Sequence, residues 1–228
     1  MRIGLVSDVS VTSNCDITAH DGVIALKRFA CLLVQQGFQV QWLTAVDTAQ
    51  TLSSESGLTP VDPAEMPPTC QYVLPYNLYR LDGVDLVCLP RSYWQDRALH
   101  TRLFTFMCLI QRERPCVLWQ TWGTLATAYL TAYTAAFLNL PCAVFYTSAC
   151  LREAPHQGFL WQWVTHHTHL GLVGTAAERT CLLETTDLTP EAVQVFDALV
   201  PAAAEHITTL YQTLQYRNED HAYLPTYP

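Results

Sequence analysis

Polar side chains and glycines gather in the loops that follow apolar stretches typical of buried strands. The loop residues suited to contact a ligand are Ser7, Asp8, Asp21, Gly22, Thr121, Trp122, Gly123, Thr147, Ser148 and Thr175. Many of them lie at the start of an apolar helical pattern, and a helix N-terminus presents free N–H groups and a partial positive charge. Such groups favour an anionic or hydroxyl-rich ligand. Turns of this kind are common whether or not they bind a ligand, so the turns alone do not assign a function.

The sequence lacks the motifs of the common nucleotide-binding and hydrolytic sites. It contains no Gly-x-Gly-x-x-Gly, no Walker loop and no Gly-x-Ser-x-Gly. Dinucleotide binding, P-loop binding and the simplest serine hydrolase are therefore excluded. No nucleophile can be paired with a base, so the sequence identifies no catalytic residue, and it predicts no cofactor.

Four histidines lie close together in the sequence, at positions 156, 166, 167 and 169. His166 and His169 are three residues apart and would share one face of a helix, which is the convergence that a metal ion needs. However, no Asp, Glu or Cys completes an obvious ligand set, and imidazoles at a helix end also cap carbonyl groups. We therefore expect no metal site.

Charged residues are scarce, and no basic cluster is present. They make up 14% of the chain, against roughly 25% in an average soluble protein. The net charge is −8, and no basic group is larger than a pair such as Arg112 and Arg114, so the concentrated positive field that a nucleic acid requires is missing. The hydrophobic content of 50% supports a large core. So few charges indicate that one face is covered by a partner, a further domain or a membrane.

The cysteines and the apolar stretches predict a cytoplasmic protein. The nine cysteines are odd in number and form no Cys-x-x-Cys, and the first eight residues reach Asp8 without a signal-peptide core. No charged residue occurs from Pro115 to Leu151, but Gly123, Asn139 and Pro141 interrupt this stretch. It is better interpreted as strand, helix and strand than as a transmembrane span.

Apolar patterns typical of strands alternate along the chain with patterns typical of helices, which predicts an α/β domain. Strands are expected at 2–7, 38–44, 84–89, 115–120, 142–147, 170–173 and 193–196, with a further short strand at 71–74, and helices at 23–36, 96–113, 123–139, 159–169, 176–183 and 201–216. This order predicts a single doubly wound, mainly parallel sheet of about six or seven strands with helices on both faces. The domain would occupy residues 1–200, with an irregular Pro-rich loop at 45–80, and a C-terminal helix and tail would occupy 201–228.

Four segments, in this order, resemble the amino-terminal half of family-4-type GT-B glycosyltransferases. They are DGVIALKRFACLLVQQGFQVQWLTA, ERPCVLWQTWGTLATAYLTAYTAAFLNLPCAVFYTS, HHTHLGLVGTAAERTCLLE and TTDLTPEAVQVFDALV. The LPYNLYRL segment is similar to the branch that contains sulfoquinovosyl-diacylglycerol synthases and related lipid-linked sugar transferases. The resemblance implies a Rossmann-like domain that binds a sugar or lipid acceptor, while the carboxy-terminal half of such enzymes binds the nucleotide sugar.

The resemblance leaves three functions open. The first is an acceptor-side domain that works with a separate donor-binding subunit. The second is a non-catalytic binding or assembly module, because Thr147 and Ser148 stand where the family has a His-Asp or His-Thr pair, and a threonine is a poor general base. The third is a complete small enzyme with another substrate. Partners thus include a donor-binding subunit or a second copy of the chain, and peripheral membrane contact stays open.

Overall fold

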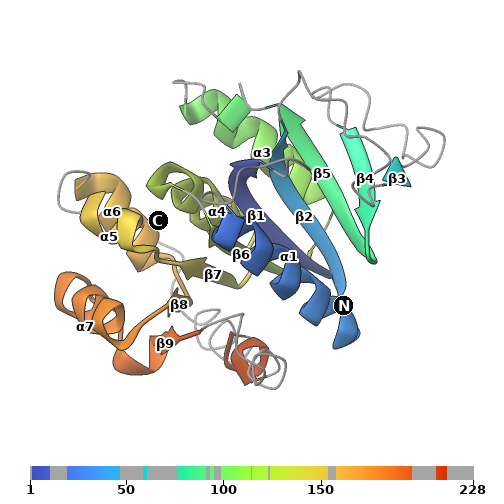
Figure 1. The fold of residues 1–228 in the computed structure, drawn as a ribbon. Helices are drawn as coiled ribbons and strands as arrows, with labels where there is room; N and C mark the ends of the chain where they lie inside the picture. Colours follow the sequence, from blue (N-terminus) through green and yellow to red (C-terminus); the bar gives the residue numbers. More distant parts are fainter. Residues whose placement is uncertain are drawn as a thin grey trace.

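The computed structural model describes residues 2–10, 20–46, 59–60, 77–90, 93–94, 99–113, 115–122, 124–153, 158–196 and 209–214. The described strands form one nine-stranded sheet (Figure 1). They are β1 (Arg2–Ser10), β2 (Gln39–Val46), β3 (Thr59–Pro60), β4 (Asn77–Leu81), β5 (Val84–Pro90), β6 (Val117–Trp122), β7 (Cys142–Phe145), β8 (Leu170–Val173) and β9 (Val193–Val195). The helices are α1 (His20–Gln35), α3 (Leu99–Glu113), α4 (Leu125–Phe137), α5 (Ser148–Glu153), α6 (Gly158–His166) and α7 (Ala176–Thr185), with a 3-10 turn, η6 (Pro190–Ala192).

The sheet is wound outward in both directions from its centre. Its order is β3-β4-β5-β2-β1-β6-β7-β8-β9, and all pairs from β5 to β9 are parallel. The chain moves from β1 through β2 to β5 on one side, and from β6 to β9 on the other. The strand order therefore reverses between β1 and β6, and in such sheets ligands bind at the carboxyl ends of the strands beside this reversal. This arrangement confirms the predicted doubly wound α/β fold.

Helices cover both faces of the sheet, and each face has its own hydrophobic core (Figure 1). On one face Phe106 of α3, Leu130 of α4 and Val164 of α6 are fully buried. On the other face Leu33 of α1 packs in the same cluster as Leu210, which lies in the helical segment 209–214. Both faces of the central strands are buried, and β7 and β8 are accordingly continuous apolar runs, whereas β2 (QVQWLTAV) keeps some alternation.

Local turn chemistry fixes several element ends. Gly37 follows α1 with φ +85°, which is the left-handed position expected for a glycine after a helix. Asp82 and Gly83 have φ values of 48° and 83° and join β4 to β5 as a two-residue hairpin. Positive φ at both residues is the requirement of a type I′ turn, for which Asp-Gly is a preferred pair.

The structure departs from the sequence prediction mainly at one edge of the sheet. β3 and β4 lie in the segment expected to be irregular, and both pair in antiparallel fashion, so the sheet has nine strands rather than six or seven. The short helix α5 was not predicted. The strand expected at 71–74 lies outside the described residues, as does most of the helix expected at 201–216. The uncharged stretch 115–151 forms β6, α4 and β7, as expected, and also the start of α5. No helix in the described part of the chain is long and apolar enough to cross a membrane.

Candidate functional site

Asp8 anchors the carboxyl end of β1 to the start of α4, beside the reversal of strand order. Its Oδ2 accepts hydrogen bonds from the Thr124 backbone N–H (3.0 Å), the Thr124 hydroxyl (3.0 Å) and the Thr127 hydroxyl (2.6 Å). Thr124 is also the N-cap of α4, since its Oγ1 accepts the Thr127 N–H at 3.4 Å. A carboxylate at this position is stabilised by the N–H groups and by the helix dipole.

The three contacts of Asp8 all use the same carboxylate oxygen. Among the described residues none donates to Oδ1, and the Asp8 side chain is only half-buried. A carboxylate has about four lone-pair positions on two oxygens. The second oxygen can therefore accept a hydroxyl or N–H group from a ligand while the first holds the helix in place.

Ser7, which the sequence placed in the ligand-binding set, has a different role. Its side chain is fully buried, its Oγ accepts the Trp42 indole N–H at 2.8 Å, and it donates to the Thr44 hydroxyl at 3.5 Å. Both partners lie on β2. Ser7 therefore satisfies a buried indole inside the sheet, and in this conformation it does not reach the surface.

Ser7→Ala is expected to lower the free energy of unfolding by about 1–2 kcal/mol, because the buried Trp42 N–H would lose its acceptor. Chemical denaturation followed by circular dichroism measures this change. Ser148→Ala is the matched control, since Ser148 is exposed, and it should cost less. Equal costs would show that the indole finds another acceptor.

A second hydrogen-bonded group joins the starts of α5 and α7. Thr147 caps α5, since its Oγ1 accepts the Cys150 N–H at 3.2 Å. Ser148 donates to Oε1 of Glu178. Thr175 caps α7 by accepting the Glu178 N–H at 3.1 Å, and its hydroxyl donates to Oε2 of Glu178 at 3.1 Å, which also accepts the Gly174 N–H at 3.1 Å. Glu178 thus links two helix starts at the carboxyl ends of β7 and β8.

The structure brings together some of the residues selected from sequence and leaves others undescribed. Ser148 and Thr175 meet through Glu178, while Asp8 contacts α4. The backbone of Asp21 and Gly22 lies in the first turn of α1, and that of Thr121 and Trp122 ends β6, but their side chains are not among the described ones. Gly123 lies outside the described residues.

Sequence reasoning missed Thr124, Thr127 and Glu178 as site residues. Glu178 had a local signal, because Thr175-x-x-Glu178 is the pattern of a capping box. Thr124 also stands before an apolar helical run, as N-cap residues do. Thr127 had no comparable signal, because its contact with Asp8 joins positions 119 residues apart.

The histidines near α6 do not converge on one point. The His167 ring stacks on Trp163 with 3.5 Å between ring centroids, and its Nδ1 lies 2.9 Å from the Trp163 carbonyl. Burial lowers the pKa of His167, with a smaller lowering from His166 and an opposing effect of the hydrogen bond to the Trp163 carbonyl. His169 accepts the Cys142 N–H at Nδ1 instead. Within the described ranges no group of three or more His, Cys, Asp or Glu could hold a metal ion.

Comparisons with known proteins agree on the fold. No protein-family model matches the sequence, and no curated protein matches it. The structure is similar to sucrose-phosphate synthase from Thermosynechococcus elongatus, with a TM-score of 0.59 and 11% identity over 94% of this chain and 99% of that chain. It is also similar to UDP-GlcNAc 2-epimerase from Methanocaldococcus jannaschii and to MnaA of S. aureus, solved with UDP, each with a TM-score of 0.53 and 12% identity over 86% of this chain.

The chain spans about 45% of the length of the last two of these structures. At such identities the likeness establishes the fold alone. That fold is a Rossmann-like α/β domain of the kind that forms one half of GT-B proteins, the class to which these glycosyltransferase-like neighbours belong. The resemblance seen in the sequence is thereby confirmed at the level of the fold.

Proposed function

We propose that the chain is a glycosyltransferase-like acceptor-side domain that works with a separate donor-binding subunit in sugar transfer from a nucleotide sugar. The observation that carries this proposal is Asp8, which is fixed through Oδ2 at the reversal between β1 and β6 and whose Oδ1 has no donor among the described residues. The chain spans about 45% of the length of two of the similar structures, a share that one of two domains would cover. The fold is established above, and we add to it the role of binding the acceptor.

The carboxyl ends of the parallel strands carry groups suited to bind a sugar or lipid acceptor with free hydroxyls. Asp8 would accept the hydrogen bond of the attacking hydroxyl and take its proton as that oxygen bonds to the anomeric carbon of the donor sugar. The bond from that carbon to the diphosphate would break at the same time, and the nucleotide diphosphate would leave with the electron pair. Thr147 and Ser148 would orient neighbouring hydroxyls at the start of α5. The nucleotide diphosphate would be held by the partner. No Lys or Arg side chain is among the described hydrogen-bond partners of Asp8, and Arg152, the basic residue of α5, already donates from Nε to the Ser148 carbonyl at 3.2 Å.

The sequence predictions of a cytoplasmic location, of peripheral membrane contact and of a division at residue 200 stay predictions. Self-association is the other partner arrangement that the sequence left open. Size-exclusion chromatography with light scattering on the full chain would distinguish a second copy from a separate subunit.

Sugar transfer is tested first with the purified full chain alone. A tagged copy of the chain is then used to capture its partner from cells. The chain alone is expected to give no transfer from radiolabelled UDP-glucose or UDP-N-acetylglucosamine to extracted lipid or sugar acceptors. The reconstituted pair is expected to transfer, and Asp8→Asn should reduce the rate at least about tenfold, since proton transfer to a positioned base contributes about 10²–10⁴-fold.

The matched control is Asp82→Asn, which removes the same charge from the exposed turn between β4 and β5. That turn lies at the amino end of β5, whereas Asp8 lies at the carboxyl end of β1. It should leave transfer unchanged. Turnover by the chain alone would contradict the division of labour. An Asp8→Asn pair that transfers at the original rate would contradict the role of Asp8.

A non-catalytic assembly module is the second candidate. It is favoured by the engagement of Glu178, whose two carboxylate oxygens already accept three hydrogen bonds, and by Thr147 at the position of the family's histidine. In that case Asp8→Asn and Ser148→Ala would leave the cellular phenotype intact, while substitutions at the partner interface would abolish it.

A further inference from the structure

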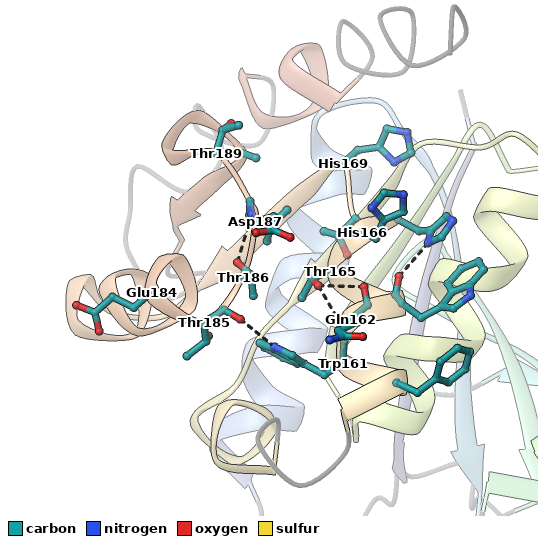
Figure 2. A pocket seen from close by; sticks show the side chains of 16 residues that line it. Trp161, Gln162, Thr165, His166, His169, Glu184, Thr185, Thr186, Asp187 and Thr189 are labelled. Atoms are coloured by element: carbon teal, nitrogen blue, oxygen red, sulfur yellow. Dashed lines mark hydrogen bonds between the residues drawn. The ribbon is translucent and has the colours of Figure 1, made fainter. Parts of the chain in front are cut away.

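A cavity of about 870 Å³ opens at the opposite edge of the sheet from Asp8 (Figure 2). One wall is α6 with the turn that leads into β8, and the other wall is the end of α7 with the segment that leads into η6. Trp161 of α6 joins the two walls, because its indole N–H donates to the Thr185 carbonyl at 3.3 Å. Small-molecule sites commonly have volumes of about 300–1,000 Å³.

Three of the threonines that line this cavity present hydrogen-bond acceptors, although Oγ1 of Thr186 already accepts the Leu188 N–H at 3.4 Å. Thr165 donates its hydroxyl hydrogen to the Trp161 carbonyl (3.1 Å), Thr185 to the Cys181 carbonyl (2.9 Å) and Thr186 to the Leu182 carbonyl (2.7 Å). A hydroxyl has one hydrogen and two lone pairs. Since the hydrogens are used within the helices, the oxygens can offer only lone pairs to a ligand.

The histidine contacts fix which ring nitrogen carries the proton. The Trp163 carbonyl can only accept, so Nδ1 of His167 is the donor, and a neutral His167 has an acceptor at Nε2. His169 accepts at Nδ1, so a neutral His169 carries its proton on Nε2. The His167 ring is held by its hydrogen bond to the Trp163 carbonyl and by stacking on the Trp163 ring. The Trp163 ring in turn stacks on Tyr133.

The charges of the cavity are negative when the imidazoles are neutral. Figure 2 shows Asp187 on the α7 side facing His166 and His169, while Glu184 stands farther out on α7. The described lining includes no Lys or Arg. Donors are also present, at Nε2 of a neutral His169 and at the Gln162 amide, but with neutral imidazoles the formal charges of the described lining are the two carboxylates. A phosphate or carboxylate ligand would therefore meet like charges, whereas a positively charged group that carries donors would be complementary. An ammonium group has three donors and no acceptor.

We propose that this cavity is a second ligand site, which binds a small organic amine as its ammonium cation, with Asp187 as the principal contact. The site lies at the amino ends of β8 and β9 and shares no residue with the groups around Asp8 and Glu178, so it goes beyond the transfer function proposed above. Glu184 contributes from the rim, and the acceptor oxygens of Thr165, Thr185 and Thr186 direct the N–H groups.

The test compares cyclohexylmethylamine with cyclohexylmethanol, which have similar shapes and differ in the cationic group. Isothermal titration calorimetry on the full chain at pH 7.5 is expected to show at least about tenfold tighter binding of the amine, as one charge-assisted hydrogen bond supplies. Asp187→Asn should weaken amine binding about tenfold, and Glu184→Gln by a smaller factor. Both residues are exposed, so neither substitution should impair folding, and thermal melts would verify this.

Acidification supplies a second readout. The titratable groups that line the cavity are His166 and His167 from α6, His169 before β8, Glu184 from α7 and Asp187 after it. Histidines gain protons as the pH falls toward 5, and this added positive charge should weaken amine binding at pH 5.5 relative to pH 7.5.

Controls separate this site from general attraction to a chain of net charge −8. Asp82→Asn makes the same change of charge outside the cavity and should leave amine binding unchanged. Equal binding of amine and alcohol, equal effects of Asp82→Asn and Asp187→Asn, or tighter binding of inorganic phosphate than of the amine would each overturn the proposal.

Discussion

Asp8→Ala is expected to lower the free energy of unfolding by about 3 kcal/mol. The carboxylate accepts three hydrogen bonds from Thr124 and Thr127, and hydrogen bonds to a charged group contribute about 1.5–3 kcal/mol each when buried. The side chain is half-buried, so the total is well below the sum. Urea denaturation followed by circular dichroism measures the loss. The m value, which is the slope of the free energy of unfolding against urea concentration, should stay unchanged if the native fold is retained.

The cause of this loss can be separated from a general effect of charge. Asp8→Asn keeps one acceptor oxygen and should cost about half as much. Thr127→Val removes one of the three donors, and combined with Asp8→Ala it should show a coupling of about 1 kcal/mol. Asp82→Asn should change stability by less than about 0.5 kcal/mol, because asparagine tolerates the positive φ of that turn. A similar cost for Asp8→Ala and Asp82→Asn would mean that Asp8 does not anchor α4.

Local sequence patterns were sufficient for most of the parallel part of the fold. β8 begins and ends where the apolar run LGLV predicted it, since a short buried strand between two helices has sharp polar boundaries. Gly37 ends the first helical unit because its left-handed backbone suits a glycine. The interpretation of the uncharged stretch 115–151 as strand, helix and strand was confirmed, because its length and interruptions match short buried elements.

The antiparallel edge could not be predicted in the same way. β4 reads NLYRL, which is neither continuously apolar nor long, and its pairing with β5 depends on the turn at Asp82 and Gly83. That Asp-Gly pair is a hairpin signal which the sequence analysis did not use. α5 has six residues, too few to show a helical period.

The candidate site depended on contacts between distant positions. Ser7 and Asp8 are neighbours on a strand buried on both faces, so no alternation of polar and apolar residues shows that Ser7 points inward and Asp8 toward α4. The partners of Asp8 are 116 and 119 residues away. The cavity beside α6 likewise forms from two segments that only the fold brings together.

Trp119→Ala is expected to lower the free energy of unfolding by about 4 kcal/mol, a typical cost for removing a buried tryptophan. Trp119 lies on β6, is 1% exposed, and contacts the edge of the Phe29 ring of α1, with 4.9 Å between ring centroids. It stands opposite Leu5 in the β1–β6 pair, so its loss opens a cavity beneath the strands that carry Asp8. The midpoint of thermal unfolding should fall by about 10 °C.

Phe137→Ala is the matched control, because Phe137 is a large aromatic residue that is 65% exposed on α4. It should change stability by less than about 0.5 kcal/mol. Since domains are stable by only about 5–15 kcal/mol in total, a loss of 4 kcal/mol at Trp119 would remove much of the stability of the fold. If the two substitutions cost the same, α1 would not be packed across the reversal between β1 and β6. The strand pair β1–β6, and with it the position of Asp8 on which the proposed acceptor site depends, would then lack the support of α1.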